Sequence, residues 1–261
     1  MSAAAPAPAS TALLEVRSLA CSFGGVQAVV DASFFVQPGT ITGLIGPNGA
    51  GKSTVIDLIS GRTKPAAGRV LFAGEDITDR KSHEVSRRGI IRTFQKANVF
   101  DQLTVVENLL VGAPAWEDER LSRALGPRAW WRDGETERVE RAYAVLRRFE
   151  LERLANDYAG ELSGGQKRLV ELMRALMANP RLLLLDEPMA GVNPTLALSI
   201  AEHLDDLRSD GITMLMVEHE LRWVEQLCDP IIVMARGRVL AEGSMAELQE
   251  NEQVVDAYLG G

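Results

Sequence analysis

The most informative segment of the chain is Gly46-Pro47-Asn48-Gly49-Ala50-Gly51-Lys52-Ser53-Thr54. It matches the pattern G-x-x-x-x-G-K-[ST], in which glycines let successive backbone N–H groups curl around phosphate oxygens. Residues 40–45 form a short apolar run before this loop, and residues 54–60 carry apolar side chains at helical spacing after it. A strand that runs into the loop and a helix that leaves it predict an α/β fold that binds phosphate groups.

The whole loop is expected to line a nucleotide, and two of its side chains have specific roles. Lys52 is placed to reach the β- and γ-phosphates, and the Ser53 hydroxyl is placed to ligate Mg²⁺. The alternative is a glycine-rich turn that matches by accident, which residue frequencies allow in roughly one chain in a hundred of this length. The flanking strand and helix weaken that alternative, so we expect ATP and Mg²⁺ as cofactors.

Two carboxylates follow a second apolar strand. Leu182 to Leu185 are all leucine, and Asp186 and Glu187 come directly after them, at the strand end where α/β sheets bind their ligands. Asp186 is placed to hold Mg²⁺ through its water shell, and Glu187 is placed to orient and deprotonate an attacking water. Taken alone, the pattern fits an apolar strand that ends in a solvated acidic turn equally well. The phosphate loop elsewhere in the chain favours the catalytic interpretation.

His219 also follows an apolar run, residues 214–217, and is expected just past the end of a strand. A neutral imidazole there would hydrogen-bond the γ-phosphate or the water. A lone histidine is more often structural, but its place on a strand neighbouring the other motifs favours a functional role. His83 and His203 lie in charged helical surroundings and are expected on the surface.

A second glycine-containing turn, Ser163-Gly164-Gly165-Gln166, follows Leu162 and precedes an amphipathic helix. Ser163 is a favourable N-cap residue, and the two glycines permit close approach by a phosphate. The turn has no lysine of its own, which makes sense if it closes on the ATP held by another copy of the domain. The alternative is a capped helix with a flexible entry, and only the conjunction with the other motifs argues against it.

The rest of the chain alternates strand and helix signals. Expected strands cover residues 13–19, 32–36, 40–45, 70–72, 90–94, 182–186, 213–218, 230–235 and 238–242. Expected helices cover residues 54–60, 104–111, 135–149, the segment from the second turn to residue 178, 195–209 and 220–227, and Ser244 to Glu247 has the spacing of a capping box that opens a last helix. This alternation predicts a mainly parallel sheet with helices on both faces.

The same pass predicts the domain organisation. We expect a disordered Ala/Pro-rich tail over residues 1–12 and a single domain over 13–261. Its core comprises residues 13–95 and 167–243, with an antiparallel β portion at the N-terminal end, an inserted helical lobe at about 96–166 and a C-terminal helical extension at 244–261. Residues 112–134 hold three of the four tryptophans and form either an insertion with its own apolar cluster or a contact surface for a partner.

Composition excludes several classes. Hydrophobic residues make up 46% and charged residues 25% of the 261 residues, which is typical of a soluble globular protein. The net charge of −8 argues against a general nucleic-acid or anionic-membrane surface. Cys21 and Cys228 are expected to be reduced, buried thiols of a cytosolic protein. No apolar run is long enough to cross a bilayer, so a membrane role requires a partner.

Together these motifs resemble the ABC-type ATPase subunits, over roughly residues 13–259. The resemblance identifies residues 46–54 as Walker A, 162–166 as the signature, 182–187 as Walker B and His219 as the switch histidine. It implies that Gln95 is the Q-loop glutamine, which contacts Mg²⁺ and couples to a membrane subunit. It also implies that Phe23 stacks on adenine, although Phe23 is equally readable as a strand-end core residue.

Within that family, Arg92-Thr93-Phe94-Gln95 resembles the importers for branched-chain amino acids and related polar solutes. The Trp-bearing insertion, the loop at residues 190–194 and the ending at residues 257–260 resemble them too. Asn193 stands where many relatives carry Asp, which makes any hydrogen bond there neutral rather than charge-assisted. The branched-chain subfamily shares this Asn.

The resemblance implies an ATP-hydrolysing subunit that is peripheral on the cytoplasmic face of the membrane. Two such domains would hold two ATPs head to tail, each between Lys52 of one chain and residues 163–165 of the other. The implied partners are a second ATPase subunit, identical or related, membrane-spanning permease subunits and, indirectly, a solute-binding protein, but no nucleic acid. Urea, short amides or lipopolysaccharide are alternative cargoes. A non-transport ABC ATPase is a further alternative, which the single motor, the absence of a heptad run and the negative charge disfavour.

Overall fold

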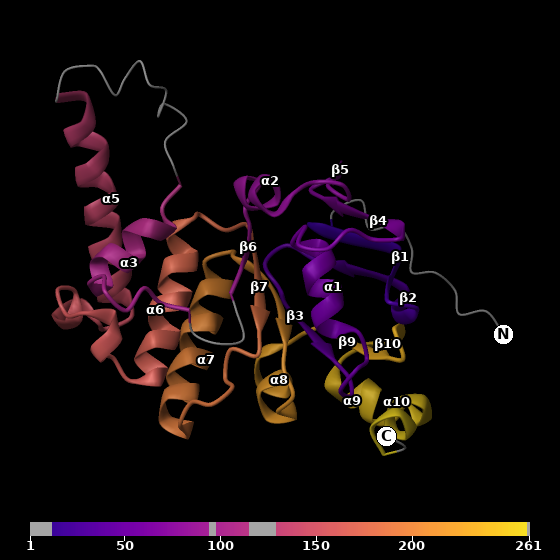
Figure 1. Ribbon diagram of the computed structural model, residues 1–261. Helices are drawn as coiled ribbons and strands as arrows, with labels where there is room; N and C mark the ends of the chain where they lie inside the picture. The colour runs from indigo at the N-terminus through magenta and orange to yellow at the C-terminus, as the bar shows by residue number, and fades with distance from the viewer. Residues whose placement is uncertain (1–11, 94–97, 115–128, 260–261) are drawn as a thin grey trace. The chain divides into compact units, whose positions relative to one another are not determined.

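The computed structural model describes residues 12–93, 98–114 and 129–259, and the chain divides into two units. The first unit comprises residues 1–82 and 208–261, and the second comprises residues 83–207. The glycine-rich loop and His219 therefore belong to the first unit. The turn at Ser163 and the pair Asp186 and Glu187 belong to the second. Figure 1 labels the helices and strands of the chain.

An antiparallel meander opens the first unit. It contains β1 (Leu14–Phe23), β2 (Val26–Val36), β4 (Ala67–Phe72) and β5 (Glu75–Asp76), and β1 pairs with both β2 and β4. Strands β1 and β2 are longer than predicted because Gly24 and Gly25, at φ +53° and +87°, form a tight turn between them. The predicted antiparallel β portion is confirmed.

Parallel strands form the buried centre of this unit. Strand β3 (Ile41–Ile45) pairs in parallel with β8 (Thr213–Val217) and β9 (Ile231–Ala235), and every residue of the three strands is buried. Strand β10 (Arg238–Gly243) pairs antiparallel with β9 and meets β2 at one parallel position, which gives the order β5-β4-β1-β2-β10-β9-β3-β8. Burial on both faces explains the uninterrupted apolar runs in the sequence.

Helices flank these strands. Helix α1 (Lys52–Ile59) follows the glycine-rich loop, and α8 (Leu221–Leu227) packs closely on β3. A Cβ on Gly43 of β3 would lie 3.1 Å from Cβ of Cys228, directly after α8. Cys21 and Cys228 are both free and buried, as predicted, and burial raises the pKa of the Cys228 thiol to about 12.

The C-terminal segment forms two helices where one was predicted. The capping box at the start of α9 (Met245–Gln249) is confirmed, because Ser244 Oγ accepts a hydrogen bond from the Glu247 backbone and Glu247 Oε2 accepts one from the Ser244 backbone. The chain turns at Asn251, whose Oδ1 accepts a hydrogen bond from the Gln253 N–H, and α10 (Glu252–Leu259) follows. A second cap inside the predicted helix therefore divides it.

The second unit combines two parallel strands with a set of helices. Helix α2 (Ser82–Arg87) leads into β6 (Ile90–Arg92), which pairs in parallel with β7 (Leu182–Asp186). Helices α3 (Val105–Gly112), α5 (Ala129–Arg148) and α6 (Gly164–Met177) pack on one another, with short 3₁₀ turns at Glu152–Leu154 and Ala159–Glu161, and α7 (Pro194–Ser209) follows β7. The predicted α/β fold with an inserted helical lobe is confirmed, because α3, α5 and α6 all come between β6 and β7 along the chain.

Helix α5 begins six residues before the predicted start at residue 135. Residues 129–134 of the Trp-bearing insertion therefore belong to a helix. Residues 115–128 of that insertion lie outside the described residues, and so do Gln95 and residues 1–11 of the tail predicted over 1–12. Within the described ranges, no helix combines the length and the apolar character that crossing a bilayer requires.

The two remaining histidines differ from each other. His83 is exposed, as predicted, whereas His203 is only partly exposed. His203 is half-buried on α7, with its ring 4.2 Å from the Phe149 ring between centroids, and burial lowers its pKa. Phe149 lies 54 residues away from His203 in sequence, so no local pattern reveals this ring contact.

Candidate nucleotide site

The loop between β3 and α1 contains two glycines at which no side chain would fit. At Gly46, with φ +148°, a Cβ would overlap the carbonyl oxygen of Met234 in β9. At Gly51, with φ +103°, a Cβ would lie 2.5 Å from the carbonyl oxygen of Ala28. These close approaches pack the loop against β2 and β9, and glycine permits the curled backbone that a phosphate cradle needs.

Substituting Gly46 by Ala is therefore expected to destabilise the nucleotide-free protein by about 1–3 kcal/mol, the usual cost of inserting a methyl group into a close-packed site. Gly49→Ala is the matched control, because Gly49 also has a positive φ, +78°, but no atom lies within 4 Å of a Cβ there. Urea unfolding without nucleotide measures both variants. Equal losses of stability in the two variants would show that the contact with Met234 is unimportant.

The side chain of Lys52 folds back on this loop. It is only 5% exposed, and its Nζ donates hydrogen bonds to the carbonyl oxygens of Gly46, at 2.7 Å, and Pro47, at 3.0 Å. Helix α1 begins at Lys52 and has no side-chain cap, so the end of the helix dipole faces the loop. An ammonium group and an uncapped helix start fit phosphate, and the exposed Ser53 hydroxyl fits Mg²⁺ as an oxygen ligand.

His219 reaches the same edge of the sheet as this loop. Leu44 of β3 pairs with Val217 of β8 in parallel register, so Gly46 and His219 each lie two residues beyond a paired position. His219 is exposed, and its backbone N–H donates a hydrogen bond to Glu218 Oε2 at 3.1 Å. The structure thus brings the predicted switch histidine and the predicted phosphate loop to one end of neighbouring strands.

Phe23 is the last residue of β1 and is 51% exposed. The alternative in which Phe23 is a buried strand-end residue is therefore wrong. An exposed aromatic ring at a strand end is suited to stacking on a planar base.

The two predicted carboxylates lie at the carboxyl end of β7 in the second unit. Asp186 is 5% exposed, and its Oδ2 lies 3.1 Å from Nη2 of Arg92 on β6. Glu187 is partly buried and has a φ of +51°, which residues other than glycine rarely adopt. In the sequence analysis Arg92 only marked a subfamily, so its pairing with Asp186 was missed.

The chemistry of these donors fits Mg²⁺ with nucleotide. A hydroxyl, a carboxylate and phosphate oxygens are the hard ligands that Mg²⁺ prefers, usually with one or two protein carboxylates. In the part of the chain that the structure describes, no group of three or more His, Cys, Asp or Glu is placed to hold a metal ion. Any Mg²⁺ would accordingly depend on oxygens from the nucleotide.

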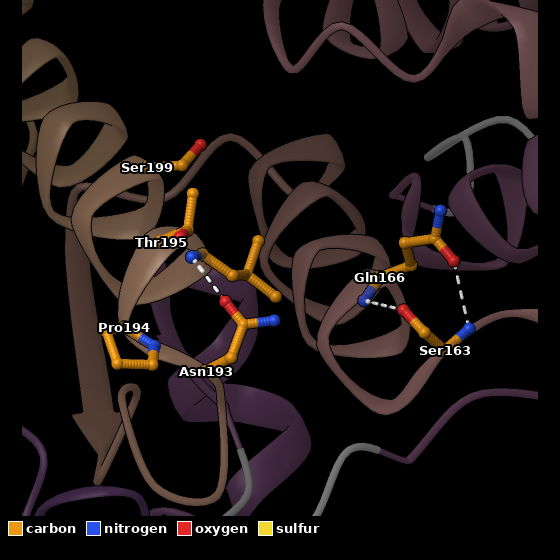
Figure 2. A pocket seen from close by; sticks show the side chains of 7 residues that line it. Ser163, Gln166, Asn193, Pro194, Thr195 and Ser199 are labelled. Atoms are coloured by element: carbon orange, nitrogen blue, oxygen red, sulfur yellow. Dashed lines mark hydrogen bonds between the residues drawn. The ribbon is translucent and has the colours of Figure 1, made fainter.

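The turn at Ser163 forms a complete capping box at the start of α6 (Figure 2). Ser163 Oγ accepts a hydrogen bond from the Gln166 N–H at 3.3 Å, and Gln166 Oε1 accepts one from the Ser163 N–H at 2.9 Å. The predicted N-cap is confirmed. Because Ser163 Oγ only accepts in this box, its hydroxyl proton remains available to donate to a phosphate oxygen. The role of Gln166 was missed, although the S-x-x-Q spacing could have revealed it.

A hollow of about 550 Å³ lies between this turn and the start of α7. Its lining residues are Ser163, Gln166, Asn193, Pro194, Thr195, Leu196 and Ser199. Asn193 Oδ1 accepts a hydrogen bond from the Leu196 N–H at 2.9 Å, which caps α7, and Figure 2 shows its amide nitrogen directed toward α6. The Asn193 oxygen is thus engaged within its own chain.

Comparison with known proteins agrees with this geometry. A family model described as ABC transporter matches residues 29–190, and a model described as branched-chain amino acid ATP-binding cassette transporter matches residues 238–261. The "Probable branched-chain amino acid transport ATP-binding protein LivG" of Archaeoglobus fulgidus is 42% identical, and the match covers 95% of each chain.

Solved structures show the same fold. An ATP-binding cassette of an ABC transporter in its ADP conformation has a TM-score of 0.83 and 39% identity, and the match covers 97% of this chain and 100% of that one. A dimeric post-hydrolysis cassette bound to ADP and Pi has a TM-score of 0.72 and 27% identity, and the match covers 89% of this chain and 98% of that one.

Proposed function

Since the chain belongs to the ABC transporter family, as one of its ATP-hydrolysing cassettes, we propose that it powers the import of branched-chain amino acids. The observation that carries the choice of cargo is the match of residues 238–261 to the branched-chain model, together with a branched-chain relative that is similar over 95% of the chain. Urea, short amides and lipopolysaccharide are the competing cargoes.

We propose a division of labour among the site residues. Residues 46–54 bind the phosphates, Phe23 stacks on adenine, and Ser53, Asp186 and Gln95 serve as ligands of Mg²⁺, which neutralises charge on the phosphates. Glu187 orients the attacking water and takes its proton, while His219 hydrogen-bonds the γ-phosphate. Two observations support these roles: Gly46 and His219 follow paired positions of the parallel strands β3 and β8, and Asp186 and Glu187 lie at the end of β7.

The complete site is proposed to need two chains. Residues 163–166 of one cassette contact the ATP bound by Lys52 of another, which is identical or related. The available hydroxyl proton of Ser163 and the dimeric state of the solved relative bound to ADP and Pi support this arrangement. Permease subunits are proposed to dock on the helical lobe at about residues 96–166, appended to the core at 13–95 and 167–243. They hold the protein on the cytoplasmic face of the membrane and receive solute from a binding protein.

The cargo is tested on the transporter that copurifies with this chain, reconstituted in lipid vesicles. Leucine supplied with its binding protein is expected to stimulate ATP hydrolysis several-fold, because a loaded binding protein favours the closed, hydrolysing state. Urea, acetamide and lipopolysaccharide, each added alone and with the binding protein, are the controls. Stimulation by one of these, without stimulation by leucine, would replace the proposed cargo and leave the ATPase assignment intact.

A further inference from the structure

A buried arginine of α6 contacts the backbone on both sides of Glu187. Arg168 lies five residues after Ser163 and is only 6% exposed. Its guanidinium donates hydrogen bonds to three consecutive carbonyl oxygens, those of Asp186 at 3.0 Å, Glu187 at 2.7 Å and Pro188 at 3.3 Å. The helix that begins at the signature turn is thereby joined to the segment that carries the proposed catalytic base.

These contacts determine the direction of the Glu187 side chain. The Asp186 carbonyl belongs to the peptide plane before the Glu187 Cα, and the Glu187 carbonyl belongs to the plane after it. Nη2 of Arg168 donates to both. Because peptide units are planar, holding the two planes fixes φ and ψ of Glu187 and hence the direction of its Cα–Cβ bond. The φ of +51° is one that the surroundings must hold in place.

A second contact holds the guanidinium itself. Nη1 of Arg168 donates to Glu171 Oε2 at 2.8 Å, one turn along the same helix, and the two side chains are only 7% and 3% exposed. Arginine suits this place because its planar fork presents several donors in fixed directions, whereas lysine offers a single ammonium group. The pair therefore moves with α6 as one rigid group.

We propose that Arg168 is a positioning residue that couples α6, and with it the turn at Ser163, to the orientation of the Glu187 carboxylate. The inference rests on the proposed function, in which the turn at Ser163 closes on the nucleotide of another chain. Closure that shifts α6 also shifts the guanidinium and the two peptide planes it holds. Glu187 then reaches its working orientation only when a partner has engaged the nucleotide, which limits hydrolysis by the single chain.

The test measures Arg168→Lys in the full-length chain. This variant keeps a cation for Glu171 but loses the fork. We expect kcat for ATP to fall about 10- to 100-fold, the scale of a small misplacement of a catalytic group, while the Kd for Mg²⁺–ATP stays within about twofold. In the Glu187→Gln background the same change should have no further effect on residual turnover, because both substitutions then remove one function.

Arg174→Lys is the matched control, because Arg174 lies on the same helix and donates to the carbonyl oxygen of Asn98, away from β7. Its kcat should be unchanged. If Arg168→Lys does not fold, the paired change Arg168→Met with Glu171→Leu removes both buried charges together and is measured by the same criteria.

Three results would overturn the inference: an unchanged kcat, a Kd that weakens in proportion to kcat, or a loss that persists in full in the Glu187→Gln background. Failure of the proposed function has a different signature. If Glu187→Gln alone keeps normal turnover, Glu187 is not the base; if Glu187→Gln is inactive and Arg168→Lys is normal, only the coupling through Arg168 is wrong.

Discussion

Replacing Glu187 by Gln is expected to leave ATP binding intact and to slow hydrolysis by about 10²- to 10⁴-fold, the range for losing a positioned general base. Gln has nearly the same shape as Glu and preserves the hydrogen bond from Arg168, which goes to the Glu187 backbone carbonyl. The carbonyl contacts that hold the left-handed backbone therefore remain. The substitution replaces the carboxylate by a neutral amide and so removes the capacity of the side chain to accept a proton.

The same variant should accumulate as a dimer when Mg²⁺–ATP is added, because the closed state forms on ATP and slow hydrolysis leaves it in place. Light scattering after size exclusion, with and without ATP, measures this, and the phosphate-release rate measures turnover. Glu202→Gln, on an exposed face of α7, is the control for loss of a carboxylate and should behave as wild type. Normal turnover in Glu187→Gln would show that another group activates the water.

The sequence predicted best those elements whose burial determines their composition. Strand β7 has the predicted bounds, since a strand buried on both faces leaves an unbroken apolar run between polar residues. Ser163 was predicted as an N-cap from its residue type, and the Ser244 capping box was predicted from two residues three apart. The predicted bounds were wrong where a local feature interrupts a longer pattern. At Asn251, for example, a side-chain hydrogen bond to the Gln253 N–H divides the predicted last helix into two.

The parts of the site that sequence reasoning missed are contacts between distant segments. Arg92 meets Asp186 across 94 residues, and Arg168 meets the carbonyls of Asp186 and Glu187 from a neighbouring helix. Neither arginine lies in a phosphate-binding pattern, and nothing in the residues next to either one indicates its partner. Such pairs arise from the packing of α6 and β6 against β7, so only the fold reveals them.

The second prediction tests whether the Lys52 and Ser163 that contact one ATP belong to the same chain or to two chains. Ser163→Arg is expected to abolish hydrolysis in a dimer that carries it on both chains, because a bulky cation replaces the hydroxyl and blocks closure of the ATP site that it enters. Lys52→Ala should abolish it too, because the ammonium that would contact the phosphates is lost. Each variant alone therefore leaves open whether Lys52 and Ser163 act in one chain or across two.

Mixed dimers, isolated through a different affinity tag on each chain, separate these cases. If the site spans two chains, a Lys52→Ala chain paired with a Ser163→Arg chain retains one intact site, formed by Lys52 of the second chain and Ser163 of the first. Its ATPase rate should equal that of a dimer of wild type with Lys52→Ala, which also has one intact site. That reference dimer accounts for any loss of cooperation between sites.

The decisive comparison places both substitutions on one chain and pairs it with wild type. Each site of that dimer then combines one wild-type element with one altered element if the sites span two chains, so hydrolysis should be lost. If each site lay within a single chain, the wild-type chain would keep its activity, and the dimer of two single variants would have none. Both mixed dimers carry the same two substitutions, so any difference in stability between them is small. Their ATPase rates therefore decide between the two arrangements.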